Sequence, residues 1–237
     1  MVIRQLTTLS EYEQCLDLQR DGFGWSDADL MPVRFFVVTH HIGGLVLGAY
    51  DDDKLVGFLS SIPAVRNRTP YWHSHMLVVS LEFRNKGTGM LLKLAQRDQA
   101  VQHGISLIEW TFDPMESKNA YFNFEKLGVI VKRYYPNFYG STSGVQGNLP
   151  TDRIVAEWWL DRDRPALTGE MRRIAIPSDI QKIKRTHIEE ARRIQERLRF
   201  EFEKNLSEGF YAVAFSHNAE ASEYVFIRRV TDAARAD

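Results

Sequence analysis

The sequence predicts a mixed α/β protein with a smaller α+β extension at its C-terminal end. Between residues 71 and 127, β-rich runs alternate with helical runs, which is typical of parallel strands covered by helices. Before this block, a turn cluster at residues 51–53 separates two apolar runs and predicts an antiparallel hairpin. From Asp161 onward, a polar break precedes a short strand, a long helix and two further strands. We therefore expect one domain over residues 1–160 and an α+β extension over residues 161–237.

The N-terminal elements are a strand, two helical stretches and the hairpin. Ser10 and Glu13 have the spacing of a capping box, which predicts a helix that continues to Leu18. In order, the expected elements are a strand over residues 2–6, this helix, an amphipathic stretch over 31–41, hairpin strands over 45–50 and 54–62, and an exposed loop over 63–70.

The same periodicities predict the central block and the extension. In the extension, apolar residues recur at steps of three or four from Ile180 to Phe202, which predicts one long helix over residues 178–206. The other expected elements are strands over 71–80, 105–112, 129–139, 153–160, 171–176, 210–215 and 224–230, helices over 87–103 and 116–127, and a Gly/Ser-rich linker over 140–150. The apolar residues that define the helix over 87–103 are Met90, Leu91, Leu94, Ala95 and Val101.

Composition and charge exclude several classes of protein. Of the 237 residues, 44% are hydrophobic and 26% charged, which is typical of a globular protein and unlike a collagen-like or disordered chain. The single cysteine, Cys15, excludes an internal disulfide and a cysteine-based metal site, and we expect no metal. No signal-peptide pattern and no run of 18 apolar residues is present, so we expect a cytoplasmic protein without a membrane partner.

The charge balance also speaks against a nucleic-acid partner. The chain has 30 basic and 31 acidic side chains, so it creates no global field for a polyanion. Along the long C-terminal helix, basic and acidic residues alternate, which is typical of a solvated face with internal ion pairs. We therefore expect no nucleic-acid binding.

The strongest local signal is the segment Arg84-Asn85-Lys86-Gly87-Thr88-Gly89, between an expected strand and an expected helix. Its glycines leave backbone N–H groups unobstructed, and a helix N-terminus attracts anions, so this turn suits a diphosphate. The alternative is a helix whose first turn is simply rich in glycine. The sequence lacks the P-loop pattern, the third glycine of a dinucleotide fingerprint and the Gly-x-Ser-x-Gly elbow, which disfavours those enzyme classes.

Two segments resemble the motifs of one superfamily. Residues 79–89, a strand end followed by the basic Gly-x-Gly turn, resemble motif A of the GNAT superfamily of acyl-CoA N-acyltransferases. Residues 119–129, Asn-Ala-Tyr-Phe-Asn-Phe-Glu-Lys-Leu-Gly-Val, resemble its motif B, a helix ending in Glu-Lys-Leu-Gly. With the N-terminal elements, the resemblance covers about residues 1–140, and the extension lies outside it.

The resemblance implies a GNAT-type mixed sheet whose central parallel strands, over 71–80 and 105–112, splay apart. The pantetheine arm of coenzyme A would enter between these strands and pair with the backbone of Leu77 and Val79. The cofactor-binding residues that the resemblance implies are Leu77, Val79, Arg84, Asn85, Lys86, Gly87, Thr88, Gly89, Ser117, Asn119 and Phe124.

One position departs from the family pattern. Where the family commonly has a tyrosine that protonates the leaving thiolate, this sequence has Phe124, which carries no proton to donate. Either Tyr121 or Tyr139 replaces it, or the thiolate leaves with help from water and helix dipoles alone, because a thiol of ordinary pKa is already a fair leaving group.

Candidate bases lie on the strand expected to line the acyl group. Aminolysis of a thioester needs a neutral amine, and deprotonating an alkylammonium of pKa about 10.4 at pH 7 costs about 4.6 kcal/mol. His75, and second His73, share one face of this strand and titrate near neutrality, although half-buried histidines are often merely structural. Glu109 or Asp113 could orient a histidine or bind the amine, although either could be an exposed charge on a strand. Arg66 and Arg68 could bind an acceptor carboxylate, although loop arginines are more often solvated.

Together these patterns predict an N-acyltransferase. We expect transfer of an acetyl group, or another short acyl group such as succinyl, from acyl-CoA to the amine of a small molecule such as an amino acid, by direct attack in a ternary complex. The extension could cover the acceptor site or form a homodimer contact. The alternative class is a non-catalytic CoA-binding sensor or structural module, which Phe124 favours.

Overall fold

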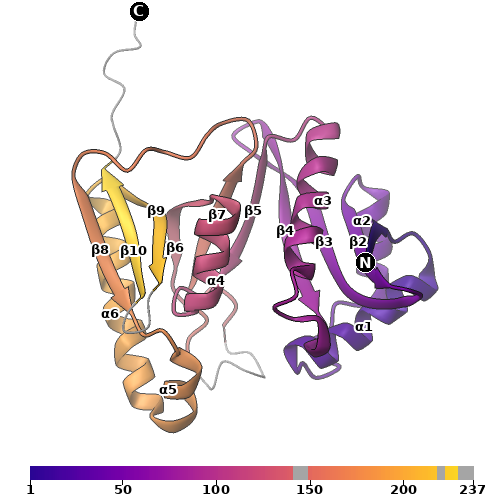
Figure 1. Cartoon of the computed structure of the whole chain (residues 1–237), viewed down its shortest axis with the longest axis horizontal. Helices are drawn as coiled ribbons and strands as arrows, with labels where there is room; N and C mark the ends of the chain where they lie inside the picture. Colours follow the sequence, from indigo (N-terminus) through magenta and orange to yellow (C-terminus); the bar gives the residue numbers. More distant parts are fainter. Residues whose placement is uncertain (141–148, 218–221, 229–237) are drawn as a thin grey trace, which may run out of the picture. The chain divides into compact units, whose positions relative to one another are not determined.

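Figure 1 shows the computed structural model of the chain, which describes residues 1–140, 149–217 and 222–228. The chain forms two compact units. Unit 1 comprises Met1–Trp110 and Trp159–Asp161, and unit 2 comprises the described residues of 111–158 together with those from 162 onward. Most of the expected linker over 140–150 and the end of the expected strand over 224–230 lie outside the described residues. The domain boundary at residue 160 stays a prediction.

Unit 1 is built on five strands in the order β1-β2-β3-β4-β5. They are β1 (Val2–Gln5), β2 (Leu45–Asp51), β3 (Lys54–Arg66), β4 (Thr69–Val79) and β5 (Leu107–Phe112). The first four pair antiparallel, as the hairpin prediction requires, and β4 pairs parallel with β5. That parallel ladder consists of Trp72 with Ile108 and His73 with Glu109, so within the described chain the later part of β4 has no β5 partner. The predicted mixed sheet is confirmed.

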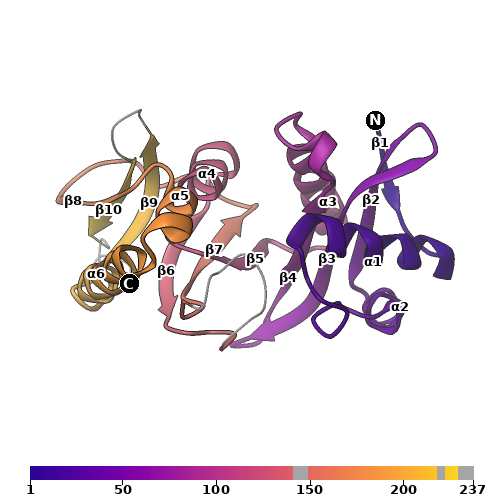
Figure 2. The same ribbon diagram turned by 90° about the horizontal axis from the view of Figure 1, so that it is seen from below.

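Helices cover both faces of these strands (Figure 2). They are α1 (Leu9–Phe23), α2 (Val33–His41) and α3 (Thr88–Gln102), with a short 3-10 turn η1 (Leu81–Phe83) before α3. One face packs against α1 and α2 through a core that includes Tyr12, Phe36, Phe58, Met76 and Val78. The other face packs against α3.

At a β-bulge in β4, the alternation of side chains between the two sides of the sheet is shifted by one residue. Ser61 of β3 pairs with Ser74 and Ser60 pairs with Met76, so His75 is the additional residue. Before the bulge, Ser74 lies toward α3 and bonds Lys93 of that helix. After it, Met76 lies in the core under α1 and α2. Bulges are frequent beside functional sites, because they re-aim side chains.

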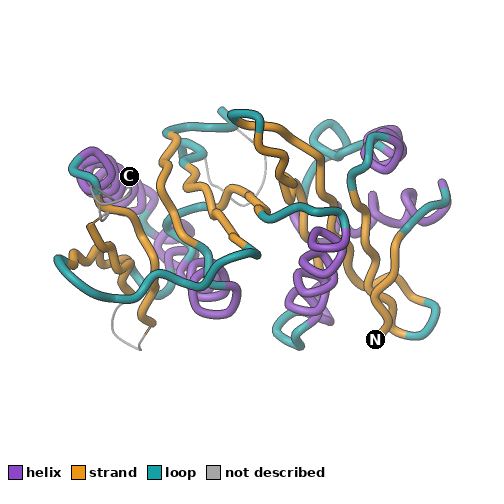
Figure 3. Tube along the Cα trace, turned by 90° about the horizontal axis from the view of Figure 1, so that it is seen from above, coloured by secondary structure: helices purple, strands orange, loops and turns teal. Residues whose placement is uncertain are grey.

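Unit 2 contains the remaining strands in the order β7-β6-β9-β10-β8, with antiparallel pairing in its described ladders. They are β6 (Ile130–Tyr135), β7 (Arg153–Trp159), β8 (Met171–Ile176), β9 (Phe210–His217) and β10 (Ser222–Arg228). The helical elements are α4 (Ser117–Tyr121), its π-helical continuation η2 (Phe122–Leu127), α5 (Ile180–Thr186) and α6 (Ile188–Ser207), and Figure 3 shows them beside the strands. Phe202 of α6 anchors the core, with ring-centroid distances of 5.5 Å to Tyr134 and 5.0 Å to Tyr224.

Two helix predictions need correction at their ends. The first helix is capped by Thr8 and Glu11 rather than Ser10 and Glu13, because both pairs fit the same spacing and burial of Tyr12 selects the earlier register. The predicted long C-terminal helix is broken at His187, which adopts a non-helical backbone. Just before the break, the Thr186 hydroxyl donates to the Lys182 carbonyl oxygen at 2.9 Å, a contact that bends helices.

The helix predicted over 87–103 is present, but the apolar residues that predicted it are not the ones it buries most deeply. Leu91 is 43% exposed and Val101 57% exposed. The side chains that α3 buries are Thr88, Leu92, Lys93, Gln96 and Ala100. The helix is amphipathic, but the strands beneath it select a face that carries polar groups. No helix among the described residues has the length and apolar character needed to span a membrane.

Candidate active site

The basic Gly-x-Gly turn forms the N-terminus of α3. Gly87, with φ of +86°, precedes the helix, and no side chain caps it. Within the part of the chain that the structure describes, a Cβ atom added at Gly87 would meet nothing within 4 Å, and one at Gly89 would meet only Leu77 Cδ2, at 3.6 Å. Space is therefore open beside both glycines, and the first N–H groups of the helix coincide with the positive end of the helix dipole. An oxyanion fits this arrangement.

Side chains of the turn make contacts that hold its backbone in place. The Arg84 guanidinium donates to the carbonyl oxygens of Val79 (3.2 Å) and Gly22 (2.5 Å). The Thr88 hydroxyl donates to the Phe83 carbonyl oxygen at 3.4 Å. Lys86 lies over the Phe83 ring, with Nζ 5.0 Å from the centroid. Arg84 thus adds positive charge near the turn while its hydrogen bonds fix the turn to β4 and α1.

The two predicted histidines lie together on β4. Their ring centroids are 6.0 Å apart, and the His75 ring is 5.1 Å from that of Phe35 on α2. Burial lowers the pKa of His73 to about 4, with a smaller contribution from His75, and burial also lowers the pKa of His75. Both rings are therefore neutral at pH 7 and have a nitrogen that can accept a proton. Sequence reasoning did not find Phe35, because α2 meets β4 only in the tertiary structure.

Glu109 lies directly opposite His73 in the parallel ladder, as the predicted grouping requires. It is almost fully buried and holds the Arg66 guanidinium in a bidentate ion pair, in which Nη1 donates to Oε2 at 2.8 Å. The Arg66 guanidinium also lies over the Tyr71 ring, 4.9 Å from its centroid. The negative charge of Glu109 opposes the lowering of the His73 pKa. Arg66 is thus engaged by Glu109 and remains partly exposed.

Lys93 is a polar site residue that the sequence reasoning missed. Its Nζ donates to Ser74 Oγ at 3.0 Å and to Gln96 Oε1 at 3.1 Å, and it lies 3.5 Å from the Trp110 ring centroid. Burial lowers the pKa of Lys93 well below the usual value for lysine. Ser74 lies between the two histidines along β4, so this buried network fixes the strand from its α3 side. The spacing in the sequence could have revealed it. Lys93 and Gln96 are three residues apart on the helix, and Lys93 is next to Leu92, so both polar side chains lie on the face that α3 buries.

In unit 2, the predicted motif B residues occupy three environments. Ser117 is buried, and its hydroxyl lies 2.8 Å from Ser222 Oγ and 3.2 Å from His217 Nδ1. Asn119 is exposed and accepts a hydrogen bond from Asn123 at 3.2 Å. Tyr121 is 37% exposed. Phe124 is fully buried against Phe112 and Tyr224.

The second candidate acid is Tyr139. Its hydroxyl lies 2.8 Å from Thr111 Oγ1, and the Arg153 guanidinium lies 5.3 Å from its ring centroid. Tyr121 and Tyr139 both keep an accessible hydroxyl-bearing ring, because each is more than one third exposed.

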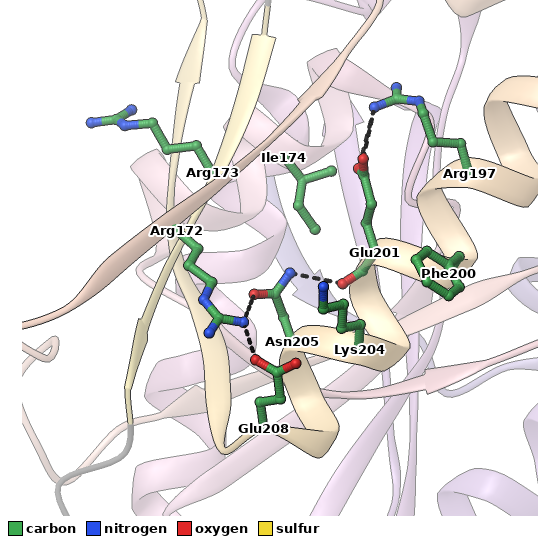
Figure 4. A pocket seen from close by; sticks show the side chains of 9 residues that line it. All are labelled: Arg172, Arg173, Ile174, Arg197, Phe200, Glu201, Lys204, Asn205 and Glu208. Atoms are coloured by element: carbon green, nitrogen blue, oxygen red, sulfur yellow. Dashed lines mark hydrogen bonds and ion pairs between the residues drawn. The ribbon is translucent and has the colours of Figure 1, made fainter.

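A separate hollow of about 600 Å³ lies between β8 and α6 (Figure 4). Its charged side chains are largely paired with each other: Arg172 bonds Glu208 and Arg197 bonds Glu201. Arg173 pairs with Glu223 on the neighbouring strand. None of the predicted site residues lines it. This hollow is therefore a solvated surface of ion pairs rather than the candidate active site.

Comparisons with known proteins agree with this architecture. Residues 12–129 match the acetyltransferase (GNAT) family, whereas no curated protein shows significant similarity. Similar solved structures include the aminoglycoside 6'-N-acetyltransferase from Enterococcus faecium, with 21% identity and a TM-score of 0.52 over 70% of this chain and 100% of that chain. The ribosomal-protein-S18-alanine N-acetyltransferase from Escherichia coli has 15% identity and a TM-score of 0.53 over 71% and 99%.

A third similar structure is a GNAT family acetyltransferase from Elizabethkingia anophelis with acetyl-CoA bound, with 17% identity and a TM-score of 0.52 over 67% of this chain and 97% of that chain. At identities this low, the structural likenesses show the fold, and the sequence match over residues 12–129 shows the family. The chain therefore belongs to the acetyltransferase (GNAT) family through the segment of residues 12–129.

Proposed function

We propose that the protein transfers an acetyl group, or another short acyl group, from acyl-CoA to the amine of a small molecule. The observation that carries this proposal is the open, uncapped N-terminus of α3, which follows the strand that bears both histidines. Its two glycines keep side chains away from the first N–H groups, as binding of a diphosphate requires.

The donor site combines the turn with the later part of β4. Arg84, Lys86 and the N–H groups from Gly87 to Gly89 bind the diphosphate, and the backbone of Leu77 and Val79 binds the pantetheine. Among the described residues, the β4–β5 ladder comprises only the pairs at Trp72 and His73, which leaves this part of β4 available for that role. Asn119 contributes its exposed amide, whereas Ser117, whose hydroxyl is already engaged, contributes backbone groups.

His75 accepts the proton of the attacking amine, directly or through one water molecule. Its position at the bulge and its neutral state at pH 7 support this role. His73 is the weaker candidate, because a pKa of about 4 makes it a poorer base. Glu109, paired with Arg66, orients His73 or binds the incoming ammonium group. Nitrogen attacks the acyl carbon, the carbon–sulfur bond breaks, and the thiolate takes a proton from Tyr121, Tyr139 or water.

A small acceptor with a carboxylate, such as an amino acid, fits this site. The partly exposed Arg66 beside Tyr71 offers a cation at the same end of β4 as the histidines.

Thiol release provides the test. Acetyl-CoA and succinyl-CoA are incubated with a panel of amino acids and simple amines, and free coenzyme A is measured with a thiol reagent. Acceptor-dependent thiol release is the expected result. Binding of acetyl-CoA in calorimetry without turnover across the panel would instead support a non-catalytic CoA-binding module, which the buried Phe124 at the usual acid position favours.

A further inference from the structure

Five side chains of the C-terminal extension converge on one short turn in unit 2. This turn, residues 113–117, connects β5 to α4 and is called the β5–α4 turn below. The side chains come from α5, β9 and β10, three separate elements, and they are Gln181, Lys184, His217, Ser222 and Tyr224. Such convergence is unusual for a connection, since loops normally satisfy their polar groups with water.

In the charged part of this contact, Lys184 and Asp113 are buried and Glu116 is partly exposed. Lys184 Nζ lies 3.0 Å from Asp113 Oδ2 and 3.3 Å from Glu116 Oε1, and the ammonium group is nearly inaccessible. Gln181 Nε2 donates to Glu116 Oε1 at 2.5 Å. Burial raises the pKa of Glu116, and the charge of Lys184 opposes that shift. One cation thus holds two carboxylates, so its removal leaves both without an ion-pair partner among the described residues.

Neutral contacts hold the centre and the end of the turn. The Tyr224 hydroxyl donates to the Pro114 carbonyl oxygen at 2.7 Å, and both groups are buried. At the first residue of α4, the Ser117 hydroxyl meets Ser222 and His217, which also contact each other at 2.8 Å. Within the turn, Asp113 Oδ1 accepts the Met115 N–H at 2.8 Å, so its two carboxylate oxygens join the turn backbone to Lys184.

We propose that the C-terminal extension positions the β5–α4 turn for the acyl-CoA donor, with Lys184 as the principal positioning residue. The inference rests on the proposed function, in which the start of α4 contacts the donor. It gives the side chains from α5, β9 and β10 a role in donor binding. Displacement of the turn by even an ångström lowers affinity, because contacts to a bound ligand depend on that distance.

The test compares Lys184→Met with Lys182→Met, which removes the same charge from an exposed position on the same short helix. Calorimetry measures acetyl-CoA affinity at a temperature where unfolding curves show each variant fully folded. We expect Lys184→Met to weaken binding at least about 10-fold and Lys182→Met less than about twofold. Hydrogen exchange of the segment over residues 113–121 reports the turn directly and should accelerate only in Lys184→Met.

Tyr224→Phe removes a single hydroxyl and tests the same idea if Lys184→Met fails to fold. It should weaken acetyl-CoA binding about threefold, the loss of one ordinary hydrogen bond. Equal affinity of wild type, Lys184→Met and Tyr224→Phe would overturn the positioning role while leaving the proposed function intact. If the wild-type protein itself binds no acyl-CoA, the proposed function fails, and this inference fails with it.

Discussion

The two turns that open α3 and α4 treat their polar groups in opposite ways. At the Gly-x-Gly turn, space is open beside both glycines, and no side chain of the described chain caps the helix. In the β5–α4 turn, five side chains from distant parts of the sequence occupy carboxylates, a carbonyl oxygen and a hydroxyl. The first turn keeps its backbone donors available to a ligand, whereas in the second the protein's own side chains engage carboxylates, a hydroxyl and one carbonyl oxygen and so hold the turn in position.

The largest effect is expected at the open turn, from Gly89→Asp. The new carboxylate would lie where we propose the diphosphate binds, and repulsion should weaken acetyl-CoA binding at least about 100-fold. A Cβ at this position meets only one atom, so the fold should survive. Gly89→Asn has nearly the same size without the charge and should lose less than about 10-fold. Calorimetry distinguishes them, and equal affinities for both variants would remove the diphosphate from this turn.

Next in size is the loss of the candidate base. His75→Ala should lower kcat about 10²-fold with little change in the KM for acetyl-CoA, as expected for a positioned base. Burial lowers the His75 pKa, so the ring is neutral at pH 7 and protonated only in acid. Wild-type activity should therefore fall as the pH drops below that lowered value. The activity of His75→Ala should not show this fall at low pH. A pH profile of the variant that matches the wild-type profile would exclude His75 from proton transfer.

His73→Ala is the matched comparison on the same strand. Because the pKa of His73 is about 4, it is a weaker base, and we expect kcat to fall no more than about 10-fold. A larger loss in His73→Ala than in His75→Ala would exchange the two assignments.

A smaller effect is expected from Phe124→Tyr, which restores the common family residue. Phe124 is fully buried against aromatic rings, so the added hydroxyl would have no water and should destabilise the protein by about 1–3 kcal/mol. The proton donor would remain elsewhere, and kcat should not rise. Urea unfolding and steady-state kinetics measure the two effects. A faster variant of undiminished stability would show that position 124 reaches the thiolate after all.

The smallest effect is a pH slope of stability caused by Lys93. Burial lowers its pKa in the folded protein, whereas the unfolded chain binds this proton up to about pH 10.4. The unfolded state therefore binds more protons in this window, and stability should rise with pH by at most about 1.4 kcal/mol per unit. Lys93→Met should lack that contribution. Urea unfolding of both proteins at pH 7, 8 and 9 gives the slopes, and parallel slopes would mean that Lys93 stays charged in the fold.

Much of unit 1 could be predicted because its signals are local. The aspartate turn at residues 51–53 gave the β2–β3 hairpin, and the basic Gly-x-Gly turn marked the start of α3. Sequence alone also grouped His73, His75 and Glu109, since a two-residue period and parallel pairing place them together. The bulge at His75 could not be predicted, because it depends on how β3 and β4 align. Lys93 was missed for a similar reason: a lysine on a helix is usually solvated unless neighbouring elements bury it.

The sequence by itself determined the turns, most of the strands and helices, and the residue types of the candidate site, because these depend on backbone preferences over a few neighbouring positions. Only the tertiary structure decided which face of α3 is buried, where the long C-terminal helix breaks and what the extension touches. Lys184 and Asp113 are 71 positions apart, and no periodicity connects them. Their contact exists because packing brings α5 to the end of β5, where burial makes each charge depend on the other.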